Sequence, residues 1–393
     1  MPDDPADGDE AGLARLISER RAKAEALRAA GGDPFPRSFP GRIPIAEARA
    51  LGEPLASGDT AEGRLRIAGR VTARRGQGKM AFLDIEDRSG SVQLWATLDR
   101  LGEDGLAAIT GLDVGDIIGA DGPIARTRRG ELSIAVESSQ LLAKALRPPP
   151  DKHAGLRDAE TRYRQRYLDL MADEDARALF ITRARAISGL RRFLDDRGFI
   201  EVETPVLQPV YGGAAARPFT THHNSLDRDL YLRIATELYL KRCIVGGLEK
   251  VYELGKDFRN EGVSFKHNPE FTMLETYEAY ADYTDVAVML EEMVGAAARA
   301  ATGGMVVPWG DDEIDLTPPW PRRDFRDAIG ESSGVDVRQH ADADSLRAAM
   351  RAAGFDAPEG ASWAKLVDNL LGQSLEPTLI QPTILTDYPI ELS

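Results

Sequence analysis

The spacing of hydrophobic and polar residues changes along the chain, and each pattern predicts a different element. Residues 11–30 carry apolar side chains at helical intervals with basic residues around them, which predicts an amphipathic helix that ends at Gly31 and Gly32. Residues 1–10 are rich in Asp, Pro and Gly, so we expect a disordered tail. A basic helix can bind RNA, but packing on its own domain is the commoner role and the one we favour.

Short runs that alternate between apolar and polar residues dominate the next part of the chain. They lie at residues 65–71, 80–87, 91–95, 116–120 and 131–136. A helical pattern at 98–110 separates the third run from the fourth. Five short strands with turns between them predict a small β-barrel, and the OB-fold is the barrel we favour.

The second half of the chain alternates between helical and strand patterns. A long helix at 174–197 ends at Gly198 and leads into a strand at 199–204. Strands at 250–259 and 271–279 then flank a polar loop. Further helices are expected at 285–301, 343–353 and 363–371, and further strands at 305–307, 313–316 and 383–391.

These patterns divide the chain into segments. After the tail at 1–10, we expect an N-terminal helical extension at 11–62, the barrel at 63–146, a linker at 147–162 and a second domain at 163–393. Three consecutive prolines stiffen the linker and mark the boundary between the domains.

Composition and charge narrow the class of protein. Apolar residues make up 42% of the chain and charged residues 29%, and no apolar run is long enough to cross a bilayer, so we expect a cytoplasmic protein. The single cysteine, Cys243, excludes an internal disulfide, and the five histidines show no metal-ligand spacing. The net charge of −15 argues against indiscriminate nucleic-acid binding, so any RNA contact needs a local basic patch.

Such a patch lies on the first barrel strand and the loop after it. It consists of Arg64, Arg66, Arg70, Arg74, Arg75 and Lys79. On the strands that follow, Phe82 offers a ring on which a base can stack, and Gln93 offers an amide for a base edge. A core position explains Phe82 as well, because aromatic residues of strands are usually buried.

The two strands around the polar loop have an unusual composition. Alternation puts Asp257 and Arg259 on one face of the first strand, and Phe271, Glu275 and Tyr277 on one face of the second. An arginine can bind a carboxylate or phosphate, and an aromatic ring can cover a purine, so the pattern is typical of a pocket for a nucleotide and a small acid. A two-stranded ribbon with cross-strand ion pairs explains the same residues equally well.

Longer runs in these regions resemble a known family. Phe-Arg-Asn-Glu-Gly at 258–262, His-Asn-Pro-Glu-Phe-Thr at 267–272 and Ala-Tyr-Ala-Asp-Tyr at 279–283 are similar to the second signature motif of class II aminoacyl-tRNA synthetases, in the form carried by lysyl-tRNA synthetases. Runs at 69–75 and 91–95 resemble the anticodon-binding domain of the same enzymes. The resemblance implies a multidomain α+β fold, in which a five-stranded OB-fold barrel precedes a catalytic domain built on an antiparallel sheet flanked by helices.

The resemblance also implies a role for individual residues. Arg259 would be catalytic, holding the lysine carboxylate and the α-phosphate of ATP. ATP binding would fall to Arg259, Asn260, Glu261, His267, Asn268 and Phe271, with Phe271 stacked on adenine. Lysine binding would fall to Gly213, Glu237, Arg259, Glu275 and Tyr277, and anticodon binding to Arg74, Phe82 and Gln93. Without the resemblance, Glu237 is explained as a first-turn helix residue that follows an N-cap at Thr236.

The chain departs from the family's pattern after Tyr283. The third class II motif, a Gly-rich strand and helix with an arginine for the γ-phosphate, is not found there, nor are the carboxylates that hold Mg²⁺. We therefore expect a C-terminally incomplete catalytic domain with no metal site of its own, and Mg²⁺ ligands in a missing C-terminal part. Little or no lysine-dependent pyrophosphate exchange is expected from these 393 residues alone.

The function implied is that of a lysine–tRNA ligase. Its expected partners are L-lysine, ATP as substrate, tRNA(Lys) and a second copy of the chain bound through residues 174–205, without a membrane or DNA. One alternative is an aspartyl- or asparaginyl-tRNA synthetase, which the acidic Glu237 and Glu275 argue against. The other is a non-catalytic tRNA-binding relic, which the missing third motif favours.

Overall fold

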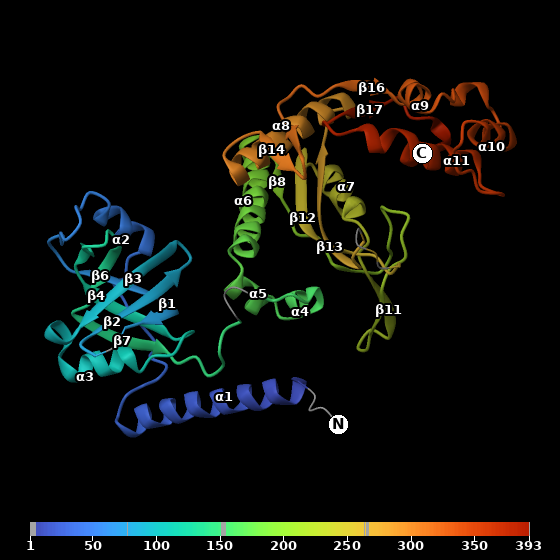
Figure 1. The fold of residues 1–393 in the computed structure, drawn as a ribbon. Helices are drawn as coiled ribbons and strands as arrows, with labels where there is room; N and C mark the ends of the chain where they lie inside the picture. Colours follow the sequence, from blue (N-terminus) through green and yellow to red (C-terminus); the bar gives the residue numbers. More distant parts are fainter. Residues whose placement is uncertain (1–4, 77, 151–154, 263, 265–266, 393) are drawn as a thin grey trace. The chain divides into compact units, whose positions relative to one another are not determined.

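A computed structural model describes residues 5–76, 78–150, 155–262, 264 and 267–392. The chain divides into two compact units, Met1–Arg177 and Ala178–Ser393 (Figure 1). Residues 1–4 of the expected tail and 151–154 of the expected linker lie outside the described residues. The first unit extends past the expected linker, because it includes helices α4 (Ala159–Arg164) and α5 (Arg166–Ala172).

Helix α1 (Pro5–Ala29) packs on the first unit rather than standing free. It begins at Pro5, inside the stretch predicted to be a disordered tail, and proline suits the first helical position because its missing N–H is not needed there. Arg20 is buried and donates to the carbonyl oxygens of Val114, Ala145 and Arg147. This packing is the role that the sequence favoured.

Residues 65–143 of the first unit form an OB-fold barrel, as predicted. Its strands are β1 (Leu65–Arg75), β2 (Met80–Asp87), β3 (Gly90–Thr97), β4 (Ile117–Gly122), β5 (Ile124–Arg126), β6 (Leu132–Ala135) and β7 (Ser138–Ala143). Within the described residues, the sheet has the order β5-β6-β3-β2-β1-β4-β7. Strands β5 and β7 were not predicted, because β5 is a three-residue continuation of β4 beyond Pro123 and β7 alternates weakly.

The barrel has a single hydrophobic interior in the described part of the chain. Inward-facing side chains of β1 to β6 fill it, among them Ile67, Leu83, Leu94, Ile118 and Ile134. Helices α2 (Ile45–Gly52) and α3 (Leu98–Thr110) add Ile45 and Ile109 to this core. The alternate positions of β2 and β3 therefore face outward, where a ligand can reach them.

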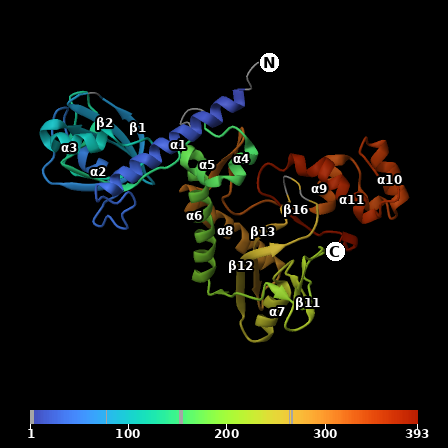
Figure 2. The same ribbon diagram turned by 90° about the horizontal axis from the view of Figure 1, so that it is seen from below.

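The second unit is built on a small sheet with two long helices packed against it. Antiparallel strands β12 (Lys250–Phe258) and β13 (Glu270–Glu278) are joined by the short parallel strand β8 (Ile200–Glu201). Helix α6 (Glu174–Asp196) supplies Leu194, and helix α8 (Tyr283–Thr302) supplies Met289 and Met293, to a cluster around the fully buried Tyr252. Figure 2 shows α6 and α8 together beside β12 and β13.

A second sheet and one helix complete the surroundings of β12 and β13. Strands β9 (Leu207–Gln208), β10 (Thr220–His223) and β11 (Arg228–Leu232) pair antiparallel in the order β10-β11-β9. Helix α7 (Glu237–Val245) follows β11 and contacts both β12 and β13. The antiparallel sheet flanked by helices is the catalytic-domain architecture that the sequence predicted.

The last part of the chain forms a small helical layer with its own core. Strands β14 (Val306–Trp309) and β15 (Asp312–Asp315) make a hairpin, and β16 (Arg322–Asp324) pairs in parallel with β17 (Ile384–Thr386). Helices α9 (Phe325–Ser333), α10 (Ala343–Ala352) and α11 (Trp363–Leu370) bury Phe325, Leu346 and Leu366 against one another. The strand predicted at 383–391 is shorter than expected, and none of the described helices is long and apolar enough to cross a membrane.

Candidate functional site

The strand pair β12–β13 presents one face of chemically active side chains. Glu253 pairs with Glu275 across the strands, Asp257 pairs with Phe271, and Val251 pairs with Tyr277. Cross-strand partners point to the same side of a sheet, so the two faces that alternation picked out separately are one face. This register is what brings the predicted site residues of both strands together.

Glu275 is held in a fixed orientation on this face. Its Oε1 accepts a hydrogen bond from the backbone N–H of Thr236 at 3.1 Å, and its Oε2 accepts one from the Tyr277 hydroxyl at 3.2 Å. Thr236 precedes helix α7 as its N-cap residue, but its side chain makes no capping hydrogen bond. The carboxylate of Glu275 therefore takes the place of the predicted threonine cap at the positive end of the helix.

Glu237 and Gly213 meet beside the same carboxylate. Gly213 has a φ of +88°, and a Cβ there would lie 2.9 Å from the Cβ of Glu237, so only glycine lets this loop approach the start of α7. Burial, together with the charges of Glu275 and Glu237, raises the pKa of Tyr277 well above its usual range. The phenol therefore stays protonated. Four of the five residues predicted to bind lysine therefore lie together: Gly213, Glu237, Glu275 and Tyr277.

Arg259 lies just beyond the end of β12. Its guanidinium carbon is 5.2 Å from the centroid of the Phe271 ring, and its Nε is buried without a hydrogen-bond partner among the described residues. Asn260, Glu261, His267 and Asn268 follow in the exposed loop between the strands. There, His267 Nδ1 is 2.8 Å from the hydroxyl of Ser264.

A buried ionic layer lies under the site, and the sequence did not single it out. Arg233, at the end of β11, pairs with Glu253 and lies 3.2 Å from Asp257, and it donates to the carbonyl oxygen of Lys256. Both Asp257 oxygens lack a hydrogen-bond partner in the part of the chain that the structure describes. The sequence signal for this layer was the pair of acidic residues, Glu253 and Asp257, on the inward face of β12, since a buried charge needs a partner.

Burial changes the titration of Asp257. Burial raises its pKa to about 6. The Arg233 guanidinium opposes that rise, and the negative charges of Glu275 and Glu253 add to it. Three carboxylates therefore share the face with Arg233 and Arg259, which leaves it short of positive charge at neutral pH when all three are ionised.

The described residues do not provide a metal site. No group of three or more His, Cys, Asp or Glu side chains among them could hold an ion. Mg²⁺ needs only one or two carboxylates beside the phosphates of a substrate, and we assign no step to a metal here.

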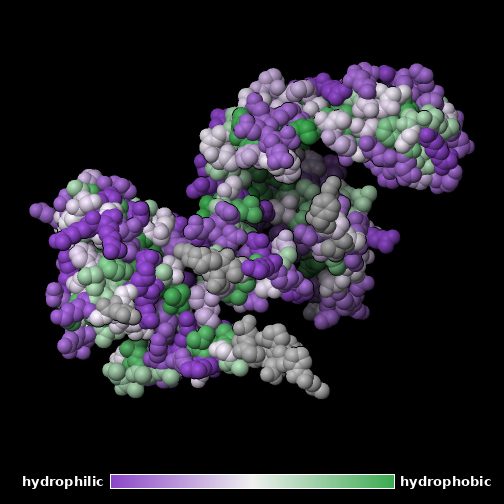
Figure 3. Space-filling view, viewed as in Figure 1, coloured by the Kyte–Doolittle hydropathy of each residue, from purple (hydrophilic) through white to green (hydrophobic). Residues whose placement is uncertain are grey.

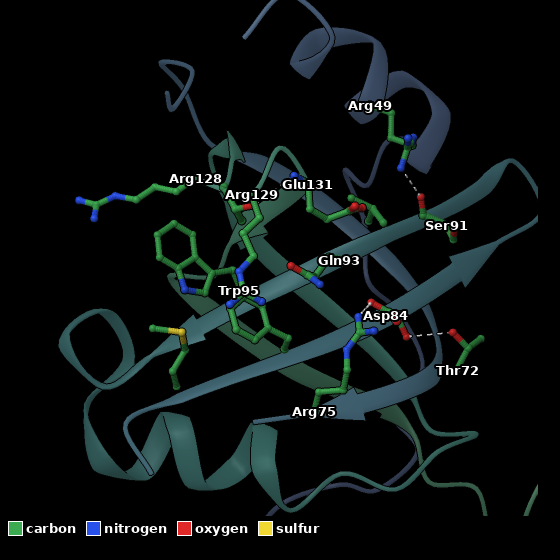
Figure 4. A pocket seen from close by; sticks show the side chains of 14 residues that line it. Arg49, Thr72, Arg75, Asp84, Ser91, Gln93, Trp95, Arg128, Arg129 and Glu131 are labelled. Atoms are coloured by element: carbon green, nitrogen blue, oxygen red, sulfur yellow. Dashed lines mark hydrogen bonds and ion pairs between the residues drawn. The ribbon is translucent and has the colours of Figure 1, made fainter. Parts of the chain in front are cut away.

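The barrel carries a second site on the outer face of β1, β2 and β3. Phe82 and Gln93 line a cavity of about 1150 Å³, together with Arg49, Thr72, Arg75, Met80, Asp84, Ser91, Val92, Trp95, Thr127, Arg128, Arg129 and Glu131. Figure 4 shows Arg75 pointing toward Asp84 on one side of Gln93, and Arg129 on the other side. The Ser133 hydroxyl donates to Gln93 Oε1 at 3.0 Å, which leaves the two N–H donors of the Gln93 side-chain amide for a ligand.

Arg74, the third predicted residue, does not line this cavity. A β-bulge between Val71 and Ala73 shifts the register, so that Arg74 pairs with the core residue Leu83 and Arg75 pairs with Phe82. Arg74 donates to the carbonyl oxygens of Thr110 and Leu112 at the end of α3, whereas Arg75 lies on the outer face and pairs with Asp84. The sequence showed both arginines but not the bulge.

Comparison with known proteins identifies the family of each part of the chain. Residues 158–393 match the model of the family described as tRNA synthetases class II (D, K and N), and residues 65–142 match the OB-fold nucleic acid binding domain. The chain therefore belongs to the class II tRNA synthetases.

The most similar relatives include three enzymes named lysine–tRNA ligase. Those of Dehalococcoides mccartyi (strain 195) and Moorella thermoacetica are each 48% identical to this chain over 96% of its length and 76% of theirs. That of Chloroflexus aurantiacus is 50% identical over 96% of this chain and 77% of its own. This chain thus spans about three quarters of each relative.

Proposed function

We propose that the second unit binds L-lysine and ATP for the synthesis of lysyl-tRNA, the reaction of a lysine–tRNA ligase. The observation that carries this proposal is the fixed carboxylate of Glu275, held by the Thr236 N–H and the Tyr277 hydroxyl and lying beside Glu237. Lysine carries two ammonium groups, which need acidic and phenolic partners. An aspartate or asparagine substrate has only the α-ammonium group, so the carboxylate that faces its side chain would be left without a partner, at a cost in binding.

The nucleotide half of the site centres on Arg259. Its planar fork suits the lysine carboxylate and the α-phosphate, and Phe271 beside it suits a purine ring. In the activation step a carboxylate oxygen of lysine attacks the α-phosphorus, and the bond to pyrophosphate breaks. Arg259 would neutralise the two anions and align them, so that no protein nucleophile is needed. Asn260, Glu261, His267 and Asn268 would orient the nucleotide from the loop.

The transfer step would use tRNA(Lys). A hydroxyl of its terminal ribose attacks the lysyl carbonyl carbon, and AMP leaves. The barrel would hold the anticodon, with a base stacked on Phe82 and hydrogen-bonded by the Gln93 amide. A cytoplasmic location, where tRNA and ATP are both present, belongs to the same proposal.

We also propose a homodimer formed through residues 174–205. Helix α6 and strand β8 expose large apolar side chains, with Leu179 66%, Ile181 44% and Ile200 47% accessible. In Figure 3 hydrophobic residues interrupt the polar surface over α6. Exposed apolar groups of this size favour burial against a second copy. Analytical ultracentrifugation should find a dimer that Leu179→Asp converts to a monomer, while a wild-type monomer at high concentration would argue against it.

Binding of a non-hydrolysable adenylate tests the catalytic proposal without requiring turnover. Lysyl-sulfamoyladenosine occupies both halves of the site at once, and calorimetry should give tight binding that Arg259→Gln weakens by at least about 10-fold. The aspartyl and asparaginyl analogues should bind far more weakly. Preferential binding of one of those analogues would support the alternative synthetases. RNA binding without binding of any analogue would support a non-catalytic relic.

A further inference from the structure

We propose that Trp95 is a second base-stacking surface, so that the barrel binds two consecutive unpaired bases, one on Phe82 and the next on Trp95. This inference rests on the proposed RNA-binding role of the barrel and adds a residue that the sequence did not select. Trp95 pairs directly with Phe82 across strands β2 and β3. Aromatic residues on adjacent strands of an open sheet face are a known arrangement for stacking two or three successive bases.

Trp95 points away from the barrel core. Its neighbours Leu94 and Ala96 are fully buried in that core, whereas Gln93 and Trp95 line the outer cavity. Figure 4 shows the Trp95 indole on the same face as Gln93. A cavity of about 1150 Å³ is at the upper end of what one small ligand fills, so it has room for more than one nucleotide.

The polar edge of the indole is unused. Trp95 Nε1 is buried and has no hydrogen-bond partner among the described residues, although a buried indole N–H usually has one. Once the side chains that cover Nε1 are displaced by RNA, a base carbonyl or a phosphate oxygen would supply the missing acceptor. Phe82 has no such donor, so the two rings would not be equivalent for the bases they hold.

The charges around Trp95 favour RNA. The guanidinium carbon of Arg100 is 5.6 Å from the Trp95 ring centroid, and Arg128 and Arg129 line the same cavity. Of the acidic residues that line it, Asp84 is paired with Arg75, which leaves Glu131 as the other carboxylate. Cations beside an aromatic platform are typical of sites that hold the backbone of single-stranded nucleic acid.

The test measures binding of the whole chain to an RNA hairpin with a seven-nucleotide loop of uridines, by fluorescence anisotropy of the labelled RNA. Trp95→Leu should weaken binding about 10-fold, and Trp95→Phe should retain most of the affinity, because any aromatic face stacks. Trp309→Leu, which removes an exposed tryptophan from β14, is the matched control and should change nothing. Circular dichroism melting checks that each variant is folded.

A double-mutant cycle separates stacking from a purely structural role. Each hairpin carries an abasic site at one loop position. At one of these positions Trp95→Leu should cause no further loss of affinity, and at a neighbouring position Phe82→Leu should cause no further loss. Wild-type affinity in a folded Trp95→Leu variant, or full additivity at every loop position, would overturn the inference alone. No binding by the wild-type chain would overturn the proposed RNA-binding role and this inference with it.

Discussion

The guanidinium of Arg233 occupies the space that a side chain at position 255 would need. A Cβ built on Gly255 would lie 2.2 Å from Arg233 Nη2, which no real contact permits. Arg233 cannot move aside cheaply, because Glu253, Asp257 and the Lys256 carbonyl oxygen hold it in a buried position. Gly255 and Arg233 together therefore let a charged layer lie under the candidate lysine site.

Gly255→Ala should lower the thermal stability of the second unit. Displacing a buried ion pair and overpacking its surroundings each cost on the order of 3 kcal/mol, so we expect a drop in Tm of about 10 °C or more by calorimetry. Gly304→Ala is the matched control, because a Cβ there meets nothing within 4 Å and the position has no left-handed backbone. Equal Tm values for the two variants would contradict the role of this contact.

The buried Asp257 should give the protein a specific pH dependence. Its pKa is raised to about 6, mainly by burial, so the folded chain holds this proton more tightly than the unfolded chain. The protonated Asp257 therefore stabilises the folded state fully below the ordinary pKa of an aspartate, and this contribution is lost as the pH rises through about 6. A shift of this size corresponds to about 3 kcal/mol.

The comparison with Asp257→Asn isolates this contribution from that of the other carboxyl groups. Between about pH 4 and pH 7, the unfolding free energy of the wild type should fall by about 2.5 kcal/mol relative to that of the variant, as measured by urea denaturation. A difference between the two proteins that stays constant over this range would show that Asp257 titrates normally.

Arg75 should contribute more to RNA binding than Arg74. The bulge in β1 puts Arg75 beside Phe82, and Arg74 at the end of α3. We expect Arg75→Gln to weaken binding of the hairpin several-fold and to reduce its salt dependence, because a cation near the phosphates is lost. Arg74→Gln should instead lower the Tm of the barrel, since two carbonyl oxygens lose their donor. The reverse pattern would restore Arg74 as the RNA-binding residue.

The sequence predicted the residues that line the site better than the residues that hold them in place. Alternation alone found the shared face of Glu275 and Tyr277, because period 2 fixes which side chains of a strand lie together. It could not reveal that Arg233, distant in sequence, would neutralise Glu253, since that pairing depends on how β11 meets β12. The bulge that places Arg75 rather than Arg74 beside Phe82 could not be predicted either, because the pattern of apolar residues does not reveal this one-residue register shift.

Titration of lysine into the protein tests most directly whether Glu275 and its neighbours recognise an ammonium group. Calorimetry should detect lysine binding but no binding of norleucine, which has the same carbon chain without the terminal ammonium. Glu275→Gln should weaken lysine binding about 10- to 100-fold. Glu278→Gln, which removes a carboxylate from the opposite face of β13, should leave it unchanged. Equal binding of lysine and norleucine, or unchanged affinity in Glu275→Gln, would contradict the assignment.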